Sequence, residues 1–196
     1  MYKKVNKLNI TENHLRVLCL FTKGFERKYY IREVQKMLDI SPRTAQTTLD
    51  KLEKKGILES KIRGKIREYK LKKNYISKEY LILTEIYKKI SFLEKNQMIK
   101  EILFKIDKHI QGIALIFGSY AKGTQKKHSD LDIFIVGNYN KKEIDKFSEM
   151  YGIGINIKKY PLDIFKKNIG NDILITEVLK NHIAVVGVED FIKIVI

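Results

Sequence analysis

Two short segments in the second half of the chain combine residue types that can hold phosphate and a divalent cation. Residues 118–123 have the sequence GSYAKG, and residues 129–132 have the sequence SDLD. A Gly-Ser turn lets the backbone approach a ligand, offers a hydroxyl that can cap a helix, and directs N–H groups at an anion such as phosphate. Asp130 and Asp132 are two residues apart, so on a strand their carboxylates point to the same side. Two such carboxylates repel unless a cation lies between them, and Mg²⁺ prefers carboxylate and phosphate oxygens.

Apolar runs on both sides of these segments predict the elements that position them. Residues 113–117 lead into the Gly-Ser turn and residues 133–136 lead out of the Asp pair, and both runs are typical of buried strands. The pattern continues with a turn at 137–140, a helix at 141–151, a strand at 153–158, a helix from 161, a helix at 172–180 and a final strand at 183–188. We therefore expect an α/β arrangement, a small mixed sheet flanked by helices.

The spacing G-S-x3-G-x5-S-D-x-D resembles the signature of the nucleotidyltransferase superfamily that includes DNA polymerase beta. The likeness is strongest to its small minimal branch, which includes antitoxins paired with ribonuclease toxins. The resemblance implies that ATP or another NTP is the substrate and that two Mg²⁺ ions are bound by the Asp pair, as in two-metal catalysis. It implies the catalytic residues Asp130 and Asp132, and the nucleotide-binding residues Gly118, Ser119, Lys122 (where many relatives carry arginine), Gly123 and Ser129.

The same resemblance implies a third carboxylate on a later strand, and this chain departs from that pattern. On the strand expected at 153–158, the position that should hold Asp holds Asn156. An amide oxygen can coordinate Mg²⁺, but it brings no charge and cannot accept a proton from the attacking hydroxyl. The expected metal ligands are therefore Asp130, Asp132 and Asn156, with a weakened catalytic metal. Asp163 lies beyond the strand and is an alternative, although a position at a helix start after Pro161 explains it equally well.

Positive charge is concentrated in the first third of the chain. The formal net charge is +16, and residues 1–75 contain 20 Lys/Arg against 8 Asp/Glu, a balance of +12. The remaining 19 basic and 15 acidic residues leave +4 for residues 76–196. This segregation favours contact between the first third and a polyanion, with nucleic acid as the leading candidate. A lysine-rich composition that only maintains solubility is the alternative.

Residues 8–73 predict three helices and a hairpin. The helices are expected at 11–23, 32–38 and 42–55, the last with Ser41 as N-cap and Pro42 in its first turn, and the hairpin turns near Gly64. This order resembles the winged helix-turn-helix of transcription regulators, which implies double-stranded DNA as a partner; protein-interaction modules of the same shape are the alternative. Basic residues at odd positions 61–67 are expected on one hairpin face, with Ile62 and Ile66 on the other. The expected DNA contacts are Arg43, Gln46, Thr47, Lys51, Lys61, Arg63, Lys65 and Arg67.

The expected domains are a winged helix at 1–75, a linker or dimerisation helix at 76–95, and a nucleotidyltransferase-like domain at 96–196. The stripe of Leu81, Ile82, Ile86 and Ile90 on the middle helix could join the domains or form a homodimer. The sequence has no apolar run near the roughly 20 residues that span a bilayer and no apolar signal segment. Its single cysteine, Cys19, lies in an apolar run and is expected to be a small core residue. A cytoplasmic protein without a membrane partner is expected.

Two hypotheses about function follow, and they belong to different classes. In the first, the chain is a Mg²⁺-dependent nucleotidyltransferase that moves NMP from ATP or another NTP to a hydroxyl of a protein or other acceptor, with a DNA-binding winged helix. In the second, it is a DNA-binding regulator whose nucleotidyltransferase domain is degenerate and senses nucleotide. An antitoxin that represses its own promoter and neutralises a toxin-like partner is compatible with either. The intact Asp pair favours the first hypothesis and Asn156 favours the second.

Overall fold

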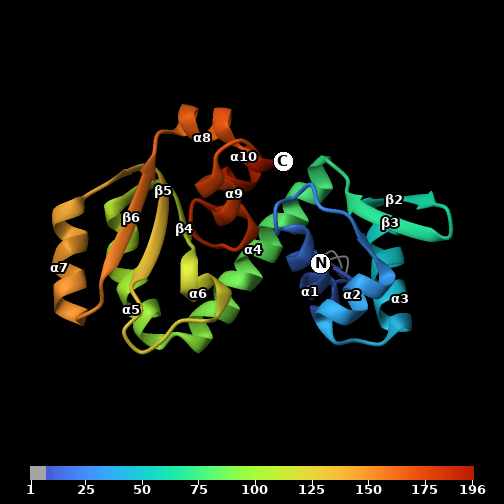
Figure 1. Cartoon of the computed structure of the whole chain (residues 1–196), viewed down its shortest axis with the longest axis horizontal. Coiled ribbons are helices and arrows are strands. Elements are labelled where there is room, and N and C mark those ends of the chain that lie inside the picture. Colours follow the sequence, from blue (N-terminus) through green and yellow to red (C-terminus); the bar gives the residue numbers. More distant parts are fainter. Residues whose placement is uncertain (1–7) are drawn as a thin grey trace, which may run out of the picture.

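The computed structural model describes residues 8–196 of the chain, and its first half contains three helices followed by a hairpin (Figure 1). A short strand, β1, pairs with β3 in an antiparallel sheet of order β1-β3-β2. Strand β1 is not among the elements expected from the sequence. The elements are α1 (Glu12–Phe21), β1 (Tyr29–Tyr30), α2 (Ile31–Leu38), α3 (Pro42–Lys54), β2 (Leu58–Arg63) and β3 (Ile66–Leu71).

The second half is built on a four-stranded sheet of order β6-β5-β4-β7. Strands β5 and β6 are parallel, whereas β4 is antiparallel to both β5 and β7, so the sheet is mixed as predicted. Its elements are α4 (Tyr75–Lys95), α5 (Gln97–Ile106), the 3-10 helix η1 (Asp107–His109), β4 (Ile110–Ile116), α6 (Gly118–Lys122), β5 (Leu131–Tyr139), α7 (Lys141–Tyr151), β6 (Ile155–Tyr160), α8 (Leu162–Asn168), α9 (Ile173–Lys180), β7 (Ile183–Val186) and α10 (Val188–Val195).

Several boundaries expected in this half were wrong, among them the strand expected at 153–158, which is β6 at Ile155–Tyr160. The turn expected at 137–140 is the end of β5, because Gly137 pairs with Gly112 of β4 and the strand continues to Tyr139. A Cβ on Gly137 would lie 2.2 Å from the carbonyl oxygen of Gln111, so the glycine permits a close backbone approach within the strand. The final strand ends at Val186 rather than residue 188, since Gly187 has a left-handed backbone (φ 65°) and α10 begins directly after it.

Alternate side chains of the central strands pack on opposite faces of the sheet. One face, with Ile133 and Ile135 of β5, forms a core with α5 and α7. The other face, with Leu115 of β4 and Phe134 of β5, belongs to a second core that also contains residues of α8, α9 and α10. This second core extends into the N-terminal half, where the rings of Phe25 and Phe191 lie edge to face with centroids 5.9 Å apart.

The long helix α4 runs between the two halves and packs on α1, α10 and β7 (Figure 1). Leu81 is fully buried, but Ile86 and Ile90 are 39% and 51% exposed, so the predicted apolar stripe is buried only at one end. The buried face of the helix also carries a charged residue, Glu85, which is completely inaccessible to solvent. The exposed end of the stripe leaves room for the homodimer expected from the sequence, which remains a prediction.

The hairpin β2–β3 corrects the predicted arrangement of its basic residues. Its turn spans two residues, so paired positions have opposite parity: Ile62 pairs with Arg67, and Arg63 pairs with Ile66. Arg67 therefore lies on the same face as Ile62, toward α3, and not with Lys61 and Arg63 as predicted. There its guanidinium group forms ion pairs with Asp50 and Glu53 of α3.

Two further observations concern Cys19 and the helices. Cys19 was predicted to be a small core residue, but it is only half-buried and lies beside the core. Burial nevertheless raises the pKa of its thiol to about 11, which keeps it protonated. Among the helices of residues 8–196, none combines the length and the apolar character needed to span a membrane.

Candidate functional site

The two aspartates lie at the start of β5, next to the turn that follows β4. Asp130 immediately precedes the strand, and Asp132 is its second residue. The backbone N–H of Phe117, the residue before α6, donates to the carbonyl oxygen of Asp132 at 3.0 Å. This bond holds the beginning of α6 against the Asp pair, so the two sequence segments 118–123 and 129–132 meet at one edge of the sheet.

Each aspartate carboxylate lies so close to a glycine that any side chain at the glycine position would collide with it. A Cβ on Gly118 would lie 2.2 Å from Oδ2 of Asp132, and a Cβ on Gly154 would lie 2.2 Å from Oδ1 of Asp130. Gly118 also has a left-handed backbone (φ 68°), which glycine adopts without strain. The positions of both carboxylates are therefore set by direct contact with the backbone of neighbouring elements.

Asn156 lies beside the Asp pair, where the sequence predicted it. Strands β5 and β6 are parallel with Asp132 opposite Asn156. The Asn156 amide nitrogen is 3.2 Å from Asp130 Oδ2 and 3.4 Å from Asp132 Oδ1, so the amide donates to both carboxylates. The amide thus supplies partial positive charge between two acidic groups, where a third carboxylate would repel them.

The site contains no third carboxylate. Among residues 8–196, no group of three or more His, Cys, Asp or Glu side chains is arranged to hold a metal ion. Asp163, the alternative considered from the sequence, lies in the first turn of α8 after Pro161. Because β6 runs parallel to β5, Asp163 follows the far end of a six-residue strand, roughly 16 Å or more from the Asp pair. It cannot replace Asn156.

The Asp pair nevertheless fits one Mg²⁺ ion. Magnesium in nucleotide sites is commonly bound by one or two carboxylates together with substrate phosphates. Neither Asp130 nor Asp132 has a lysine, arginine or histidine nitrogen within ion-pair distance in the described part of the chain. Within residues 8–196, the Asn156 amide is the only side-chain donor to these two carboxylates, so the pair is able to accept a cation.

The predicted phosphate-binding residues surround α6, with one difference in detail. The hydroxyl of Ser119 does not cap the helix as expected, because the helix begins at Gly118 and Phe117 occupies the N-cap position. Gly123 ends the helix in a left-handed conformation. Lys122 is exposed in the last turn of α6. Ser129 accepts a hydrogen bond from the Lys126 N–H at 2.8 Å, so its hydroxyl holds the loop before the Asp pair.

Two residues at this site were missed in the sequence prediction. Gly154 supports Asp130 and its carbonyl oxygen accepts from the Leu131 N–H at 2.7 Å, which fixes the start of β5. A glycine within an alternating strand pattern is the signal that could have revealed it. Tyr120 is buried in α6, and burial together with the negative charge of Asp130 raises the pKa of its hydroxyl. Its place inside the GSYAKG segment was the available signal.

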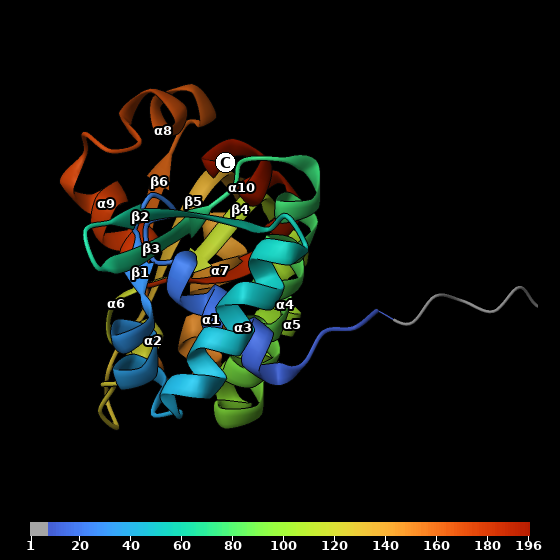
Figure 2. The same ribbon diagram turned by 90° about the vertical axis from the view of Figure 1, so that its right-hand side faces the viewer.

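The predicted DNA contacts belong to α3 and the hairpin β2–β3, two elements at the end of the molecule that faces the viewer in Figure 2. The N-terminus of α3 is capped as predicted, since Ser41 Oγ accepts from the Thr44 N–H at 3.0 Å. Arg67 is the exception because it is paired with acidic residues of α3. The exposed candidates are Arg43, Gln46, Thr47, Lys51, Lys61, Arg63 and Lys65.

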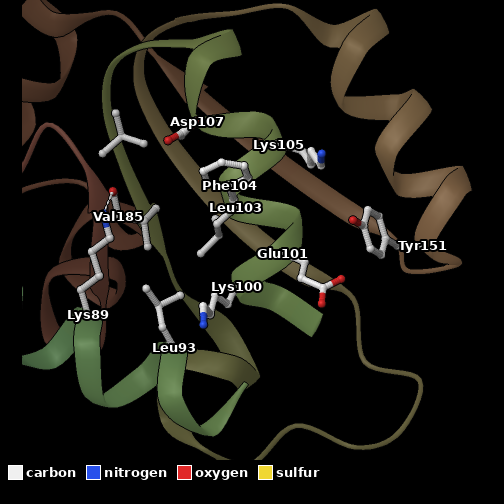
Figure 3. Close-up of a pocket in the computed structure, with 11 residues that line it drawn as sticks. Lys89, Leu93, Lys100, Glu101, Leu103, Phe104, Lys105, Asp107, Tyr151 and Val185 are labelled. Atoms are coloured by element: carbon white, nitrogen blue, oxygen red, sulfur yellow. Dashed lines mark hydrogen bonds between the residues drawn. The ribbon is translucent and has the colours of Figure 1, made fainter. Parts of the chain in front are cut away.

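A separate cavity of about 540 Å³ lies between α4, α5 and β7 (Figure 3). It is mostly apolar, with Leu93 and Leu103 in its wall, and Lys89 crosses one side to donate to the Val185 carbonyl oxygen at 2.6 Å. None of the residues predicted for nucleotide, metal or DNA binding lines it. The cavity is therefore distinct from the site at the Asp pair.

Comparison with known proteins agrees with this geometry. Residues 97–190 match the family model described as polymerase beta, nucleotidyltransferase. This range contains α6, the Asp pair and Asn156. The chain belongs to the polymerase beta nucleotidyltransferase family.

A relative from Methanocaldococcus jannaschii, which carries the provisional name protein adenylyltransferase, is 42% identical over 76 residues. The matched region is 36% of this chain and 86% of the relative. No solved structure matches the chain significantly. The family and this relative identify the C-terminal half as a nucleotidyltransferase domain, a class of domain that transfers a nucleoside monophosphate.

Proposed function

We propose that the protein is a Mg²⁺-dependent nucleotidyltransferase that transfers NMP from ATP or another NTP to a hydroxyl of a protein or other acceptor. The observation that carries this proposal is the seating of Asp130 and Asp132 on Gly154 and Gly118, beside the start of α6. Such preorganisation of two carboxylates is what a metal–nucleotide site requires. The name of the M. jannaschii relative favours adenylyl transfer to a protein acceptor.

Each part of the site has a role in this reaction. Bound Mg²⁺ would neutralise phosphate charge and lower the pKa of the attacking hydroxyl. Asp130 and Asp132 would hold the cation, and the backbone N–H groups at the start of α6 would hold the phosphates together with the Ser119 hydroxyl. Lys122 adds positive charge at the other end of α6. Asn156 positions both carboxylates through its amide, but it cannot take the proton from the acceptor hydroxyl.

Incubation with Mg²⁺ and ATP labelled at the α-phosphate tests the transfer. We expect the wild type to transfer label and the Asp130→Ala/Asp132→Ala variant to transfer none, because the cation site is lost. Asn156→Asp should increase transfer by about tenfold or more, since a third carboxylate can act as general base. The measurement is label incorporated into protein or added acceptor, per mole of folded enzyme.

A second candidate function is a DNA-binding regulator whose nucleotidyltransferase domain senses nucleotide without turnover. It is favoured by the hydrogen bonds from Asn156, which satisfy the carboxylates in the absence of a third acidic group. Label transfer by Asn156→Asp alone, with tight ATP binding by an inactive wild type, would support this candidate and contradict the first. In an antitoxin of this kind, a toxin-like partner would be the acceptor or the bound protein.

We also propose that residues 8–75 form a winged helix that binds double-stranded DNA. Exposed cations extend from Lys51 of α3 to Lys61, Arg63 and Lys65 of the hairpin, and none of these four forms an ion pair with an acid among residues 8–196. Unpaired cations are free to contact phosphates, whereas Arg67 must first leave Asp50 and Glu53.

Neutralising the tip of the hairpin should weaken DNA binding and its salt dependence. For Arg63→Gln/Lys65→Gln we expect about a tenfold or greater loss of affinity. The slope of log affinity against log salt should become shallower by about 2, because each phosphate contact contributes about 0.9. Gel retardation or fluorescence anisotropy with duplex DNA at several salt concentrations measures both quantities.

The control for this prediction is Lys141→Gln/Lys142→Gln, which removes the same charge from α7 at the other end of the molecule (Figure 1). Equal losses of DNA affinity in both variants would show that the effect comes from net charge alone, and would exclude a specific contact by the hairpin. Arg67→Gln should lower the affinity for DNA less than Arg63→Gln or Lys65→Gln alone, because the Arg67 guanidinium is already paired with acidic residues of α3.

A further inference from the structure

A small basic cavity lies where the N-terminal half meets the nucleotidyltransferase domain. Its volume is about 250 Å³. One wall comes from the end of α1 and the residues after it, another from α4, and the rest from α6 and the connection between α9 and β7. Its polar lining includes Thr22, Lys23, Lys88, Lys122, Lys180 and His182. The cavity therefore collects side chains from both halves of the protein.

The lining contains four lysines and no carboxylate. Lys23 and Lys122 have no acidic partner within ion-pair distance among residues 8–196, and Lys180 has only an exposed pairing with Glu177 at 3.2 Å. Lysine side chains that line one small space repel one another unless an anion lies between them. The cavity is consequently a site of concentrated positive charge.

Beneath the cavity, a buried network fixes Lys88 and His182 in place. Lys88 Nζ donates to both carboxylate oxygens of Glu85, at 2.7 and 2.9 Å, and to the Thr22 hydroxyl at 3.2 Å. His182 Nε2 lies 3.2 Å from Glu85 Oε1, and its Nδ1 lies 3.1 Å from the Leu179 carbonyl oxygen. Glu85 neutralises Lys88, so the positive charge available to a ligand comes from Lys23 and Lys122, which have no acidic partner among residues 8–196, and from Lys180, whose pair with Glu177 is exposed.

We propose that this cavity binds a phosphate anion, and that the anion joins the two halves by contacting Lys23 on one side and Lys122 and Lys180 on the other. Phosphate fits because its several oxygens can accept hydrogen bonds from ammonium groups that approach from different walls. Lys122 belongs to α6, the helix that also begins the proposed nucleotide site at Gly118. The anion is therefore either the phosphate tail of a nucleotide or a separate phosphate compound. The proposal rests on the proposed nucleotidyl transfer only if the anion belongs to a nucleotide.

The test uses sodium tripolyphosphate and inorganic phosphate as probes, without nucleotide or divalent cation, on the full chain at fixed ionic strength. Isothermal titration calorimetry should show binding by the wild type and about a tenfold or greater loss of affinity in Lys23→Gln/Lys180→Gln. The matched control, Lys105→Gln/Lys108→Gln, removes two exposed lysines from α5 and η1 and should bind within about twofold of the wild type. Thermal unfolding without ligand checks that both variants are folded.

Equal affinities in the wild type and Lys23→Gln/Lys180→Gln, or equal losses in the two double variants, would overturn the proposal. Neither result would affect the proposed transfer reaction, because no nucleotide is present. Competition identifies the source of the phosphate. Displacement of tripolyphosphate by ATP but not by AMP assigns the cavity to the phosphate tail of a nucleotide. Simultaneous binding of ATP and tripolyphosphate assigns it to a separate phosphate compound.

Discussion

Replacing Gly154 with alanine is expected to reduce nucleotidyl transfer by about a hundredfold or more. The new Cβ would lie 2.2 Å from Oδ1 and 2.8 Å from Cγ of Asp130, so the carboxylate must move. A displacement of about 1 Å in a catalytic group is enough to cost roughly two orders of magnitude in rate. The backbone of Gly154 is not in the left-handed region, so the substitution itself introduces no backbone strain. The measurement is the initial rate of label transfer from α-labelled ATP.

Gly152→Ala is the control for this effect. Gly152 lies two residues earlier and has open space around its Cα, although its left-handed backbone (φ 62°) makes alanine unfavourable there. This variant should lose some stability and keep its rate of transfer per folded molecule. A wild-type rate in Gly154→Ala would mean that the seating of Asp130 on the glycine does not matter for the reaction.

Glu85→Gln is expected to lower the free energy of unfolding by about 3 kcal/mol, because it leaves the charge of Lys88 almost buried without its partner. The Glu85 side chain is completely buried and that of Lys88 is only 14% exposed, so water compensates only in part for the lost carboxylate. Urea denaturation followed by circular dichroism at pH 7 measures the change. Glu59→Gln, which breaks an exposed pair with Lys70 at 3.0 Å, should cost less than about 1 kcal/mol.

The same network determines the sign of the acid response. Burial opposes ionisation of Glu85, but the charge of Lys88 and the hydrogen bonds from Lys88 and His182 outweigh it and lower its pKa from 4.5 to about 2. Because the folded-state value is the lower one, this stabilisation is complete above pH 4.5 and is lost as the pH falls toward 2. The difference in the free energy of unfolding between the wild type and Glu85→Gln should therefore decrease as the pH falls from 4.5 toward 2. An increase in this free-energy difference on acidification would contradict the assignment of a buried, ionised carboxylate.

Sequence patterns were most informative where the chemistry depends on local spacing. Asn156 was expected at the third carboxylate position because residues alternate along a strand, and the parallel register of β5 and β6 places it opposite Asp132. The strand–turn–strand around the Asp pair was likewise predictable from apolar runs on either side of polar residues. The family match and the fold confirm the nucleotidyltransferase half of the interpretation.

Features that depend on pairing between distant segments could not be obtained in this way. The face on which Arg67 lies is decided by the two-residue length of the hairpin turn, which alternation within one strand does not encode. The end of β5 depends on Gly137 meeting Gly112 on the neighbouring strand. The contact between Glu85 and His182 joins residues 97 positions apart, so neither residue had a local signal. Contacts of this kind are fixed by tertiary packing rather than by periodicity.

The shared core has a consequence for how the molecule comes apart. Phe25 from the first half packs on Phe191 near the C-terminus, and α4 contributes buried residues such as Leu81 to the same core. Removing either half would expose this apolar surface to water, so we expect the halves to lose their structure together, in one cooperative transition, and proteases to find few sites before it. Unfolding of the N-terminal half is therefore expected to end the proposed nucleotidyl transfer as well, although that half contributes no residue to the Asp pair.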